Sequence, residues 1–250
     1  MQSTTETTSP PSPLISRESL QTRAHATQLR THLGAMAHLL QDDAALDASL
    51  RATLMAHPLA AADTTLDPSS RDVWLFGYGS LIWNPLIHFI AQRVTTIRGY
   101  HRKFCLFSRV NRGSPALPGL VLGLDRGGAC TGVAYRIAAA EVWKELSLTW
   151  RREMMMNSYR AIWCAVEIDG AREYVLTFAI DRAHPACACA LTEDEVVDRL
   201  ARATGLQGSS AEYLYKTAQG LHSHGIVDLH IEALAAKVKA RIETLPASSQ

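Results

Sequence analysis

The chain has 250 residues, 47% of them hydrophobic, which is enough for one domain with a sizeable core and a small accessory segment. Its 25 basic and 24 acidic residues nearly cancel, which argues against a nucleic-acid or membrane-surface partner and favours a small neutral or mixed-charge ligand. No segment approaches the roughly 20 apolar residues of a membrane span, and no secretory signal pattern is present, so we expect a soluble, cytoplasmic protein.

The first 70 residues are predicted to be an accessory region. Residues 1–13 are rich in Ser, Thr and Pro and should be a disordered tail. Apolar residues then recur every three or four positions, which predicts two helices ending before Pro58 and followed by a linker at 60–70. These residues are Leu29, Leu33, Met36 and Leu40, then Leu46, Leu50 and Leu54. We place the helical extension and linker at 14–70, the main domain at 71–245, and a C-terminal tail at 246–250.

The main domain opens with the sequence VWLFGYGSLIW, which begins at Val73. Its apolar start predicts a buried strand that breaks at Gly77-Tyr78-Gly79-Ser80. Two glycines permit positive φ angles and close approach to a ligand, and successive amides there can converge on an anion or a developing oxyanion. A tight turn between two strands, with Tyr78 simply packed, explains the same pattern, and composition alone favours this alternative.

Short apolar runs with Gly/Pro-containing turns between them follow, which predicts a meandering sheet or small barrel. The runs lie at 103–108, 120–124 and 131–137, and the turns at 112–114, 117–119 and 126–128. A helix is predicted over 138–150 with Val142, Leu146 and Trp150 on one face. Strands at 159–168 and 173–180 flank Asp169-Gly170, a hairpin signal.

The last third of the main domain is predicted to be helical. Thr192 with Glu195, and Ser209 with Glu212, match the capping-box spacing that opens a helix. Asp228 can cap a final helix that carries Leu234, Val238 and Ile242 on one side. The predicted class is therefore α+β, with a closed or nearly closed sheet and helices around it.

Glu153 is the strongest candidate for acid/base chemistry. It follows Arg151-Arg152 at a predicted helix end and precedes Met154, Met155 and Met156. Partial desolvation beside apolar side chains raises a carboxyl pKa, as a base acting near neutral pH requires. A surface Arg–Glu pair followed by core methionines explains the same residues.

Metal and redox chemistry have little support. The five cysteines are an odd number without CxxC spacing, so neither a disulfide framework nor a zinc site is indicated, and we expect Cys187 and Cys189 to be thiols. His222 and His224, with His230 nearby, are expected to have structural or solvent-exposed roles.

Several segments, taken together and in order, resemble the ChaC family of γ-glutamylcyclotransferases, in its glutathione-specific branch. The matching segments are Phe76–Pro85, Arg98-Gly99-Tyr100 with Arg102 and Phe104, Arg112-Gly113-Ser114 with Pro118-Gly119, Gly132–Arg136, Arg152-Glu153 and Glu212-Tyr213-Leu214.

The resemblance implies a small mixed β-barrel flanked by helices. It also implies cleavage of glutathione by ring closure, which releases 5-oxoproline and cysteinylglycine without a cofactor or metal. Cyclisation of another γ-glutamyl compound, and a non-catalytic regulator associated with cation transport, are alternatives; the sequence gives no oligomeric state.

The resemblance also assigns roles to residues. Glu153 would be the acid/base, and the loop formed by Tyr78, Gly79, Ser80 and Leu81 would bind the γ-glutamyl group through backbone amides. Arg112, Tyr159 and Tyr213 would also bind substrate. The chain departs from many relatives in having Asn157-Ser158 where they have Gly-Gly or Gly-Ala before the tyrosine.

Overall fold

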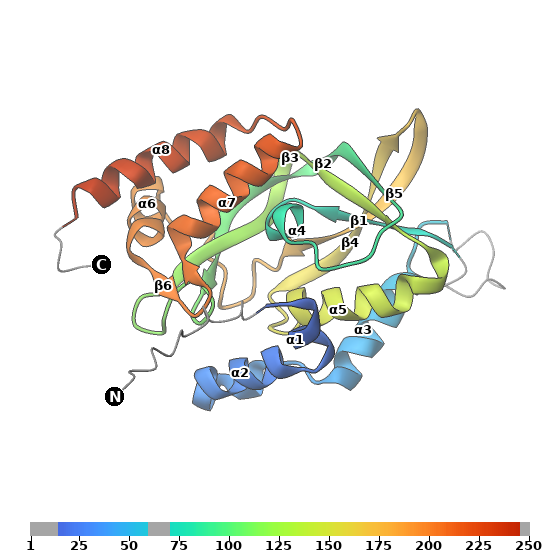
Figure 1. Cartoon of the computed structure of the whole chain (residues 1–250), viewed down its shortest axis with the longest axis horizontal. Helices are drawn as coiled ribbons and strands as arrows, with labels where there is room; N and C mark the ends of the chain where they lie inside the picture. Colours follow the sequence, from blue (N-terminus) through green and yellow to red (C-terminus); the bar gives the residue numbers. More distant parts are fainter. Residues whose placement is uncertain (1–14, 60–70, 246–250) are drawn as a thin grey trace, which may run out of the picture.

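The computed structural model describes residues 15–59 and 71–245 (Figure 1). The predicted tail at 1–13, the linker at 60–70 and the C-terminal tail at 246–250 lie outside the described residues.

The predicted N-terminal helices are present, in more pieces than expected. They are α1 (Arg17–Gln21), α2 (Ala24–Leu33), the 3-10 helix η1 (Gly34–Leu39) and α3 (Asp43–Met55). Ser16 caps α1, and Asp42 caps α3 by accepting a hydrogen bond from the Ala45 amide at 2.8 Å. The α3 residues Leu46, Leu50 and Leu54 are buried in the main core, so the extension packs against the rest of the protein.

A five-stranded mixed sheet forms the centre of the molecule. Its strands are β1 (Val73–Gly77), β2 (Ala91–Ser108), β3 (Gly119–Ile137), β4 (Tyr159–Ile168) and β5 (Ala171–Ile180), in the spatial order β2-β3-β1-β5-β4. The central strand β1 is antiparallel to β3 and parallel to β5. A separate pair of two-residue strands, β6 (Thr204–Gly205) and β7 (Gly208–Ser209), precedes α7.

The sheet curls until its two edge strands approach each other. The Thr95 hydroxyl of β2 donates to the Glu167 carbonyl of β4 at 3.0 Å. Arg93 Nε lies 2.9 Å from an Asp169 carboxylate oxygen in the turn after β4. These side-chain contacts close the gap between the edges, which agrees with the predicted nearly closed sheet.

One prediction about the sheet is wrong, and one of the two alternatives for the segment after β1 is excluded. The segment 126–128, predicted as a turn, lies inside the continuous strand β3, where Gly127 and Gly128 face an irregularity of register between Arg98 and Tyr100. Such an extra-residue irregularity bends a long strand without ending it. After β1 the chain does not continue as a strand but enters the short helix α4 (Ser80–Trp83).

The predicted hairpin and later helices are confirmed. Asp169 and Gly170 both take positive φ angles, 53° and 80°, as a two-residue turn between twisted strands requires. The helices after β3 are η3 (Ala139–Glu141), α5 (Val142–Glu153), α6 (Glu193–Arg202), α7 (Ser210–Ser223) and α8 (Leu229–Glu243). Thr192 and Glu195 form the predicted capping box, and Asp228 caps α8.

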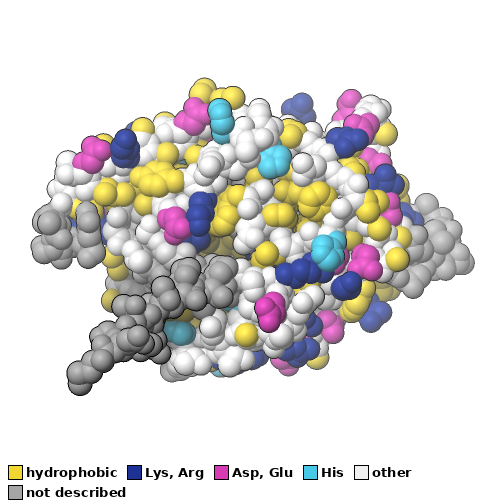
Figure 2. Space-filling model, viewed as in Figure 1, with side chains coloured by type: hydrophobic (Ala, Val, Ile, Leu, Met, Phe, Trp, Pro, Cys, Tyr) yellow, Lys and Arg dark blue, Asp and Glu magenta, His cyan; other side chains and the backbone are white. Residues whose placement is uncertain are grey.

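Helices cover the sheet from two sides. In Figure 1, α6, α7 and α8 pack together beside β2 and β3, whereas α5 lies below the sheet in this view, together with α1, α2 and α3. Trp150 of α5 is fully buried, with its ring 5.3 Å from that of Phe178 on β5. Basic and acidic side chains are interspersed on the face shown in Figure 2, in keeping with the nearly balanced charge.

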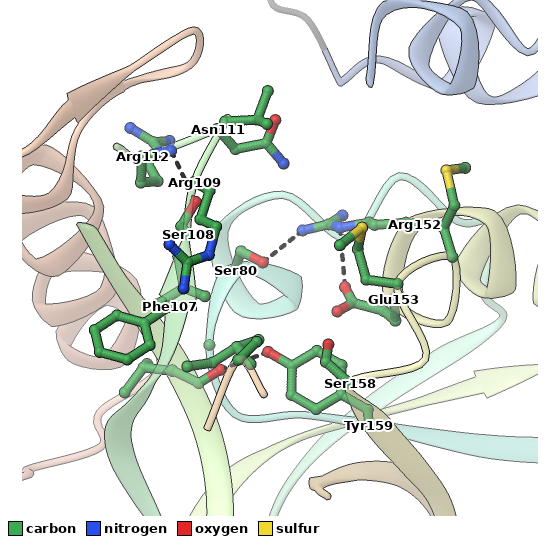
Figure 3. Close-up of a pocket in the computed structure, with 18 of the residues that line it drawn as sticks. Ser80, Phe107, Ser108, Arg109, Asn111, Arg112, Arg152, Glu153, Ser158 and Tyr159 are labelled. Atoms are coloured by element: carbon green, nitrogen blue, oxygen red, sulfur yellow. Dashed lines mark hydrogen bonds and ion pairs between the residues drawn. The ribbon is translucent and has the colours of Figure 1, made fainter. Parts of the chain in front are cut away.

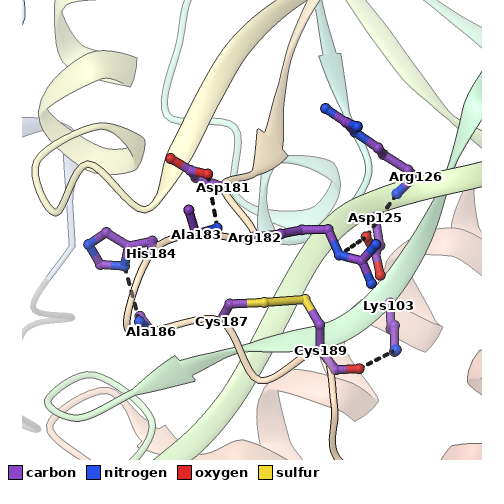
Figure 4. The surroundings of a disulfide bond; sticks show 10 residues. All are labelled: Lys103, Asp125, Arg126, Asp181, Arg182, Ala183, His184, Ala186, Cys187 and Cys189. Carbon is purple, nitrogen blue, oxygen red and sulfur yellow. Dashed lines mark hydrogen bonds and ion pairs between the residues drawn. A yellow bond between two sulfur atoms is a disulfide. The ribbon is translucent and has the colours of Figure 1, made fainter.

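Cys187 and Cys189 form a disulfide, which corrects the expectation of two thiols (Figure 4). Backbone hydrogen bonds hold this segment on β2: the Phe107 amide donates to Ala186 at 2.9 Å, and the Ala188 amide to Cys105 at 2.7 Å. The backbone path brings the two cysteine Cα atoms to 5.5 Å, within the range that a disulfide spans. Sequence spacing alone does not reveal such a path.

The remaining cysteines are buried thiols: Cys105, Cys130 and Cys164. Burial raises the pKa of Cys105 to about 12 and the pKa values of Cys130 and Cys164 to about 11. Because the thiolate is the reactive form, these three residues are inert core side chains at neutral pH.

A buried ion pair anchors the start of the N-terminal extension to α5. Arg17 binds both carboxylate oxygens of Glu145, at 2.5 and 2.6 Å, and the His88 amide adds a third hydrogen bond at 2.9 Å. Glu145 is fully buried. Burial alone would raise the pKa of Glu145, but the hydrogen bonds from Arg17 and His88 outweigh it, and the net effect lowers that pKa.

We predict that Arg17→Met lowers the free energy of unfolding by about 2 to 3 kcal/mol at pH 7, because a buried carboxylate loses its partner. The deficit should shrink as the pH falls through the ordinary glutamate pKa of about 4.3, since the stranded carboxyl becomes protonated first in the variant. Urea denaturation of both proteins at several pH values measures this difference.

Arg93→Met is the matched control, because Arg93 and Asp169 form a solvent-exposed pair whose removal should change the free energy of unfolding far less than Arg17→Met does. Equal losses in the two variants would contradict an anchoring role for Arg17.

Candidate active site

A cavity of about 400 Å³ lies where β1, β2, α5 and the N-terminal helices meet. All eight residues predicted from the sequence line it: Tyr78, Gly79, Ser80, Leu81, Arg112, Glu153, Tyr159 and Tyr213. They come from five separate segments, so the fold brings together residues that are far apart in the sequence. Figure 3 shows Ser80 lying between the Arg112 side of the cavity and the Arg152–Glu153 side.

Glu153 is the last residue of α5, and its side chain is only 15% exposed. The Glu153 carboxylate forms an ion pair with Arg152, whose Nε lies 3.0 Å from Oε1 of Glu153. Burial raises the pKa of Glu153, and the Arg152 charge opposes part of that rise. The carboxylate is therefore a stronger base than an exposed glutamate, yet it stays paired with a cation.

Arg152 is itself fixed by the β1–α4 segment. Its guanidinium donates to the Ser80 hydroxyl at 2.7 Å and to the Asn84 carbonyl at 2.5 Å. The base and the predicted binding loop are thus joined by one side chain (Figure 3).

The glycines of the β1–α4 loop serve close approach, not positive φ. Gly79 has φ −138°, which corrects the prediction, and a Cβ placed there would lie 3.0 Å from the Tyr213 hydroxyl. The amide of Ile82 donates to the Gly79 carbonyl at 2.9 Å, whereas helix geometry leaves the amides of Ser80 and Leu81 without an intrahelical acceptor. Those two amides are the donors that this loop can offer a ligand.

Arg102 holds the loop from behind, a position that the sequence analysis did not predict. It is buried, and it donates to the carbonyls of Tyr78 and Thr131, each at 2.6 Å, while pairing with Asp228. Tyr135 adds a hydrogen bond to the Leu81 carbonyl at 3.0 Å. The sequence analysis included Arg102 in a segment that resembles the ChaC family but gave it no role.

Three buried tyrosines surround the carboxylate. Burial raises the pKa values of Tyr78 and Tyr159 well above 10 and also raises that of Tyr213, and the charge of Glu153 adds to each rise. The phenols are therefore neutral hydrogen-bond donors. Tyr159 donates to the Leu122 carbonyl at 2.7 Å, which fixes its ring in the wall.

Arg112 is buried and already paired. Its guanidinium binds Glu212 at 2.9 Å and lies 5.6 Å from the centre of the Tyr213 ring. The predicted capping box at Ser209 is only half formed: Ser209 accepts from the Glu212 amide, but the Glu212 carboxylate binds Arg112 and Lys216 instead of the cap. Arg112 thus orients Tyr213.

Asn157, at a position where the family resemblance led us to expect glycine, takes a positive φ of 52°. Asparagine tolerates the left-handed region better than other residues with a Cβ, so the replacement keeps the backbone path between α5 and β4. Ser158 and Tyr159 then follow in the cavity wall.

The N-terminal helices form a wall that the sequence analysis did not predict. The cavity-lining residues from this region are Ile15, His25, Leu29, Leu33, Met36 and Leu39. Leu29 and Leu33 pack with Val110 and Met155 in a separate apolar cluster, and the Gln41 amide donates to the Met155 carbonyl at 2.8 Å. Apolar periodicity predicted the helices but not the surface that they cover.

Within residues 15–59 and 71–245, no group of three or more His, Cys, Asp or Glu side chains could hold a metal ion. None of the helices in these two ranges is long and apolar enough to span a bilayer.

The comparisons with known proteins agree with this geometry. The family model described as ChaC-like protein matches residues 73–241. The glutathione-specific gamma-glutamylcyclotransferase of Escherichia coli (strain K12) is 37% identical over 180 residues, which cover 72% of this chain and 78% of that protein. Glutathione-specific gamma-glutamylcyclotransferase 1 of Mus musculus is 28% identical, over 74% of this chain and 86% of the relative.

Solved structures show the same fold. The yeast γ-glutamyl cyclotransferase specific to glutathione, as its selenomethionine form, superposes with a TM-score of 0.63 at 23% identity, covering 68% of this chain and 96% of that one. The family match covers more than half of the chain and includes Glu153, the β1–α4 loop, Arg112 and both remaining tyrosines of the cavity. The chain belongs to the ChaC-like protein family.

Proposed function

We propose that this protein is a γ-glutamylcyclotransferase that acts on glutathione and releases 5-oxoproline and cysteinylglycine. The observation that carries the proposal is the largely desolvated Glu153 carboxylate, which lies in one cavity with the loop Tyr78–Leu81. The names of the relatives from Escherichia coli and Mus musculus support glutathione as the substrate. We propose 71–245 as the catalytic domain.

In the first step the substrate's own α-amine is the nucleophile. It is an ammonium group near neutral pH, so it must lose a proton before it can attack the γ-carbonyl carbon. Glu153 takes this proton, and its raised pKa makes it a better acceptor than an exposed carboxylate. The attack closes a five-membered ring and places negative charge on the carbonyl oxygen.

In the second step the ring intermediate collapses. The carbonyl re-forms, the C–N bond to cysteinylglycine breaks, and protonated Glu153 gives its proton to the leaving nitrogen. The freed carboxylate then takes the second proton from the ring nitrogen and passes it to the cysteinylglycine amine, so that 5-oxoproline leaves as a neutral lactam, cysteinylglycine leaves as an ammonium, and the enzyme ends in its starting state. Because nucleophile and carbonyl belong to one molecule, the protein has only to fold the substrate and stabilise the oxyanion. The amides of Ser80 and Leu81 and the phenols of Tyr78 and Tyr213 are the donors available for this.

The direct test is incubation of the purified protein with glutathione. We expect stoichiometric release of 5-oxoproline and cysteinylglycine, with γ-glutamyl-alanine as the comparison substrate. Binding of glutathione without 5-oxoproline release would contradict the proposal, and a preference for γ-glutamyl-alanine would reassign the substrate.

We predict that Glu153→Gln lowers the rate of 5-oxoproline release by roughly 10²-fold or more, because the amide cannot accept the proton. Glu167→Gln is the matched control, since Glu167 is an exposed carboxylate on β4 and outside the cavity. Near-normal turnover in Glu153→Gln, with thermal unfolding unchanged, would rule out Glu153 as the base.

We predict that the acid limb of kcat/KM has a midpoint above the ordinary glutamate pKa of about 4.3, because burial raises the pKa of Glu153. Activity needs the ionised form, so it should rise as pH rises through that midpoint. Arg152 favours the ionised form, so Arg152→Met should move the limb to higher pH.

Arg160→Met, at an exposed arginine on β4, is the control and should leave the limb in place. A limb that stays in place or moves to lower pH in Arg152→Met would contradict the electrostatic role given to Arg152.

A further inference from the structure

The arginines of the cavity differ in whether they already have a partner. Arg152 is paired with Glu153, and Arg112 with Glu212. Arg109 also lines the cavity and is half-buried. Its guanidinium makes no hydrogen bond and no ion pair with any residue of 15–59 or 71–245. It is therefore the one cavity arginine, among the described residues, whose charge is left for a ligand.

The segment that carries Arg109 is held on both sides. The Ser108 hydroxyl accepts from the Arg112 amide at 2.9 Å, and the Val110 carbonyl accepts from the Leu206 amide at 2.9 Å. Val110 is buried against the N-terminal helices, and the Arg109 guanidinium lies 5.7 Å from the centre of the Phe107 ring. The cation is thus presented from a fixed backbone, which lowers the entropy cost of binding an anion.

Arg109 and Glu153 come from opposite walls. In Figure 3 the Arg109 guanidinium points into the cavity from the β2 side, Glu153 lies on the α5 side, and Ser80 lies between them. A substrate with its γ-glutamyl group at Glu153 and the β1–α4 loop would extend its leaving half toward the opposite wall, which carries Arg109. In a tripeptide such as glutathione, this leaving half ends in a carboxylate.

We propose that Arg109 binds the terminal carboxylate of the leaving half and makes γ-glutamyl peptides with a free C-terminal carboxylate the preferred substrate class. This inference rests on the proposed function. The N-terminal wall adds the apolar side chains of Leu33 and Met36 to the same cavity. A γ-glutamyl amine, which has no such carboxylate, would leave the cation without a partner.

The test compares glutathione with its glycine monoethyl ester, which differs only at that carboxylate. We expect the wild-type protein to prefer glutathione by about tenfold or more in kcat/KM, mainly through KM. Arg109→Gln should lose a similar factor on glutathione and lose little on the ester, so that its preference falls close to one. Arg109→Lys should keep part of the preference, since it keeps the charge.

Arg199→Gln is the matched control. Arg199 also lies over the Phe107 ring, at 5.1 Å, but does not line the cavity, so this variant should keep the preference for glutathione over the ester. A purely structural role of Arg109 would lower both activities together and leave their ratio intact.

Equal kcat/KM values for the two compounds in the wild-type protein, or an unchanged preference in Arg109→Gln, would overturn the inference. Titration calorimetry gives a second readout without turnover: in Glu153→Gln, glutathione should bind more tightly than the ester, and adding Arg109→Gln should remove that difference. Equal binding of both compounds in Glu153→Gln would also overturn it. A wild-type protein that shows this binding difference but releases no 5-oxoproline contradicts only the proposed function.

Discussion

The site depends on keeping one carboxylate, Glu153, largely out of water without leaving it unpaired. Desolvation strengthens it as a base, but an isolated charge in such a place would simply take up a proton. Arg152 resolves this conflict by supplying a counter-charge at 3.0 Å while its other nitrogens are bound to Ser80 and Asn84. The same guanidinium therefore sets the basicity of the carboxylate and its position relative to the loop.

The position of the β1–α4 loop beside Arg152 depends on where strand β1 ends. Strand β1 is central, with β3 on one side and β5 on the other, so the loop after Gly77 leaves from the most constrained part of the molecule. Arg102 then fixes the Tyr78 carbonyl from behind, and Tyr135 fixes that of Leu81. A loop held by its carbonyls has little freedom to relax when a ligand binds, which is the basis of preorganised electrostatic stabilisation.

Sequence reasoning reached the parts that depend on local pattern. Thr192 with Glu195, Asp169-Gly170, and the apolar face of Val142, Leu146 and Trp150 each specify structure through nearby residues, and each appears as predicted. The site residues were predicted as a group only through the family resemblance, because no local sequence pattern connects Gly79, Glu153 and Tyr213.

The misses have a common physical cause. Gly127 and Gly128 were predicted as a turn because the bulge that they form depends on Gly99 of the neighbouring strand, and a local pattern does not reveal that pairing. Glu212 does not complete its predicted capping box, because Arg112, a hundred residues earlier in the chain, is a stronger hydrogen-bond partner for its carboxylate than a backbone amide. Cys187 and Cys189 were taken as thiols because the path that brings them together is fixed by hydrogen bonds to β2. In each case a long-range contact overrode a local preference.

The cavity is lined by two separate regions of the chain. The residues that we propose for proton transfer lie within 73–241, the region that matches the ChaC-like family, whereas one wall of the cavity comes from residues 15–39, outside that region. Changes at Leu33, Met36 or Leu39 can therefore reshape one wall of the cavity without replacing Glu153, Arg109 or the β1–α4 loop. The region shared with the family and the N-terminal segment can thus vary separately around one cavity.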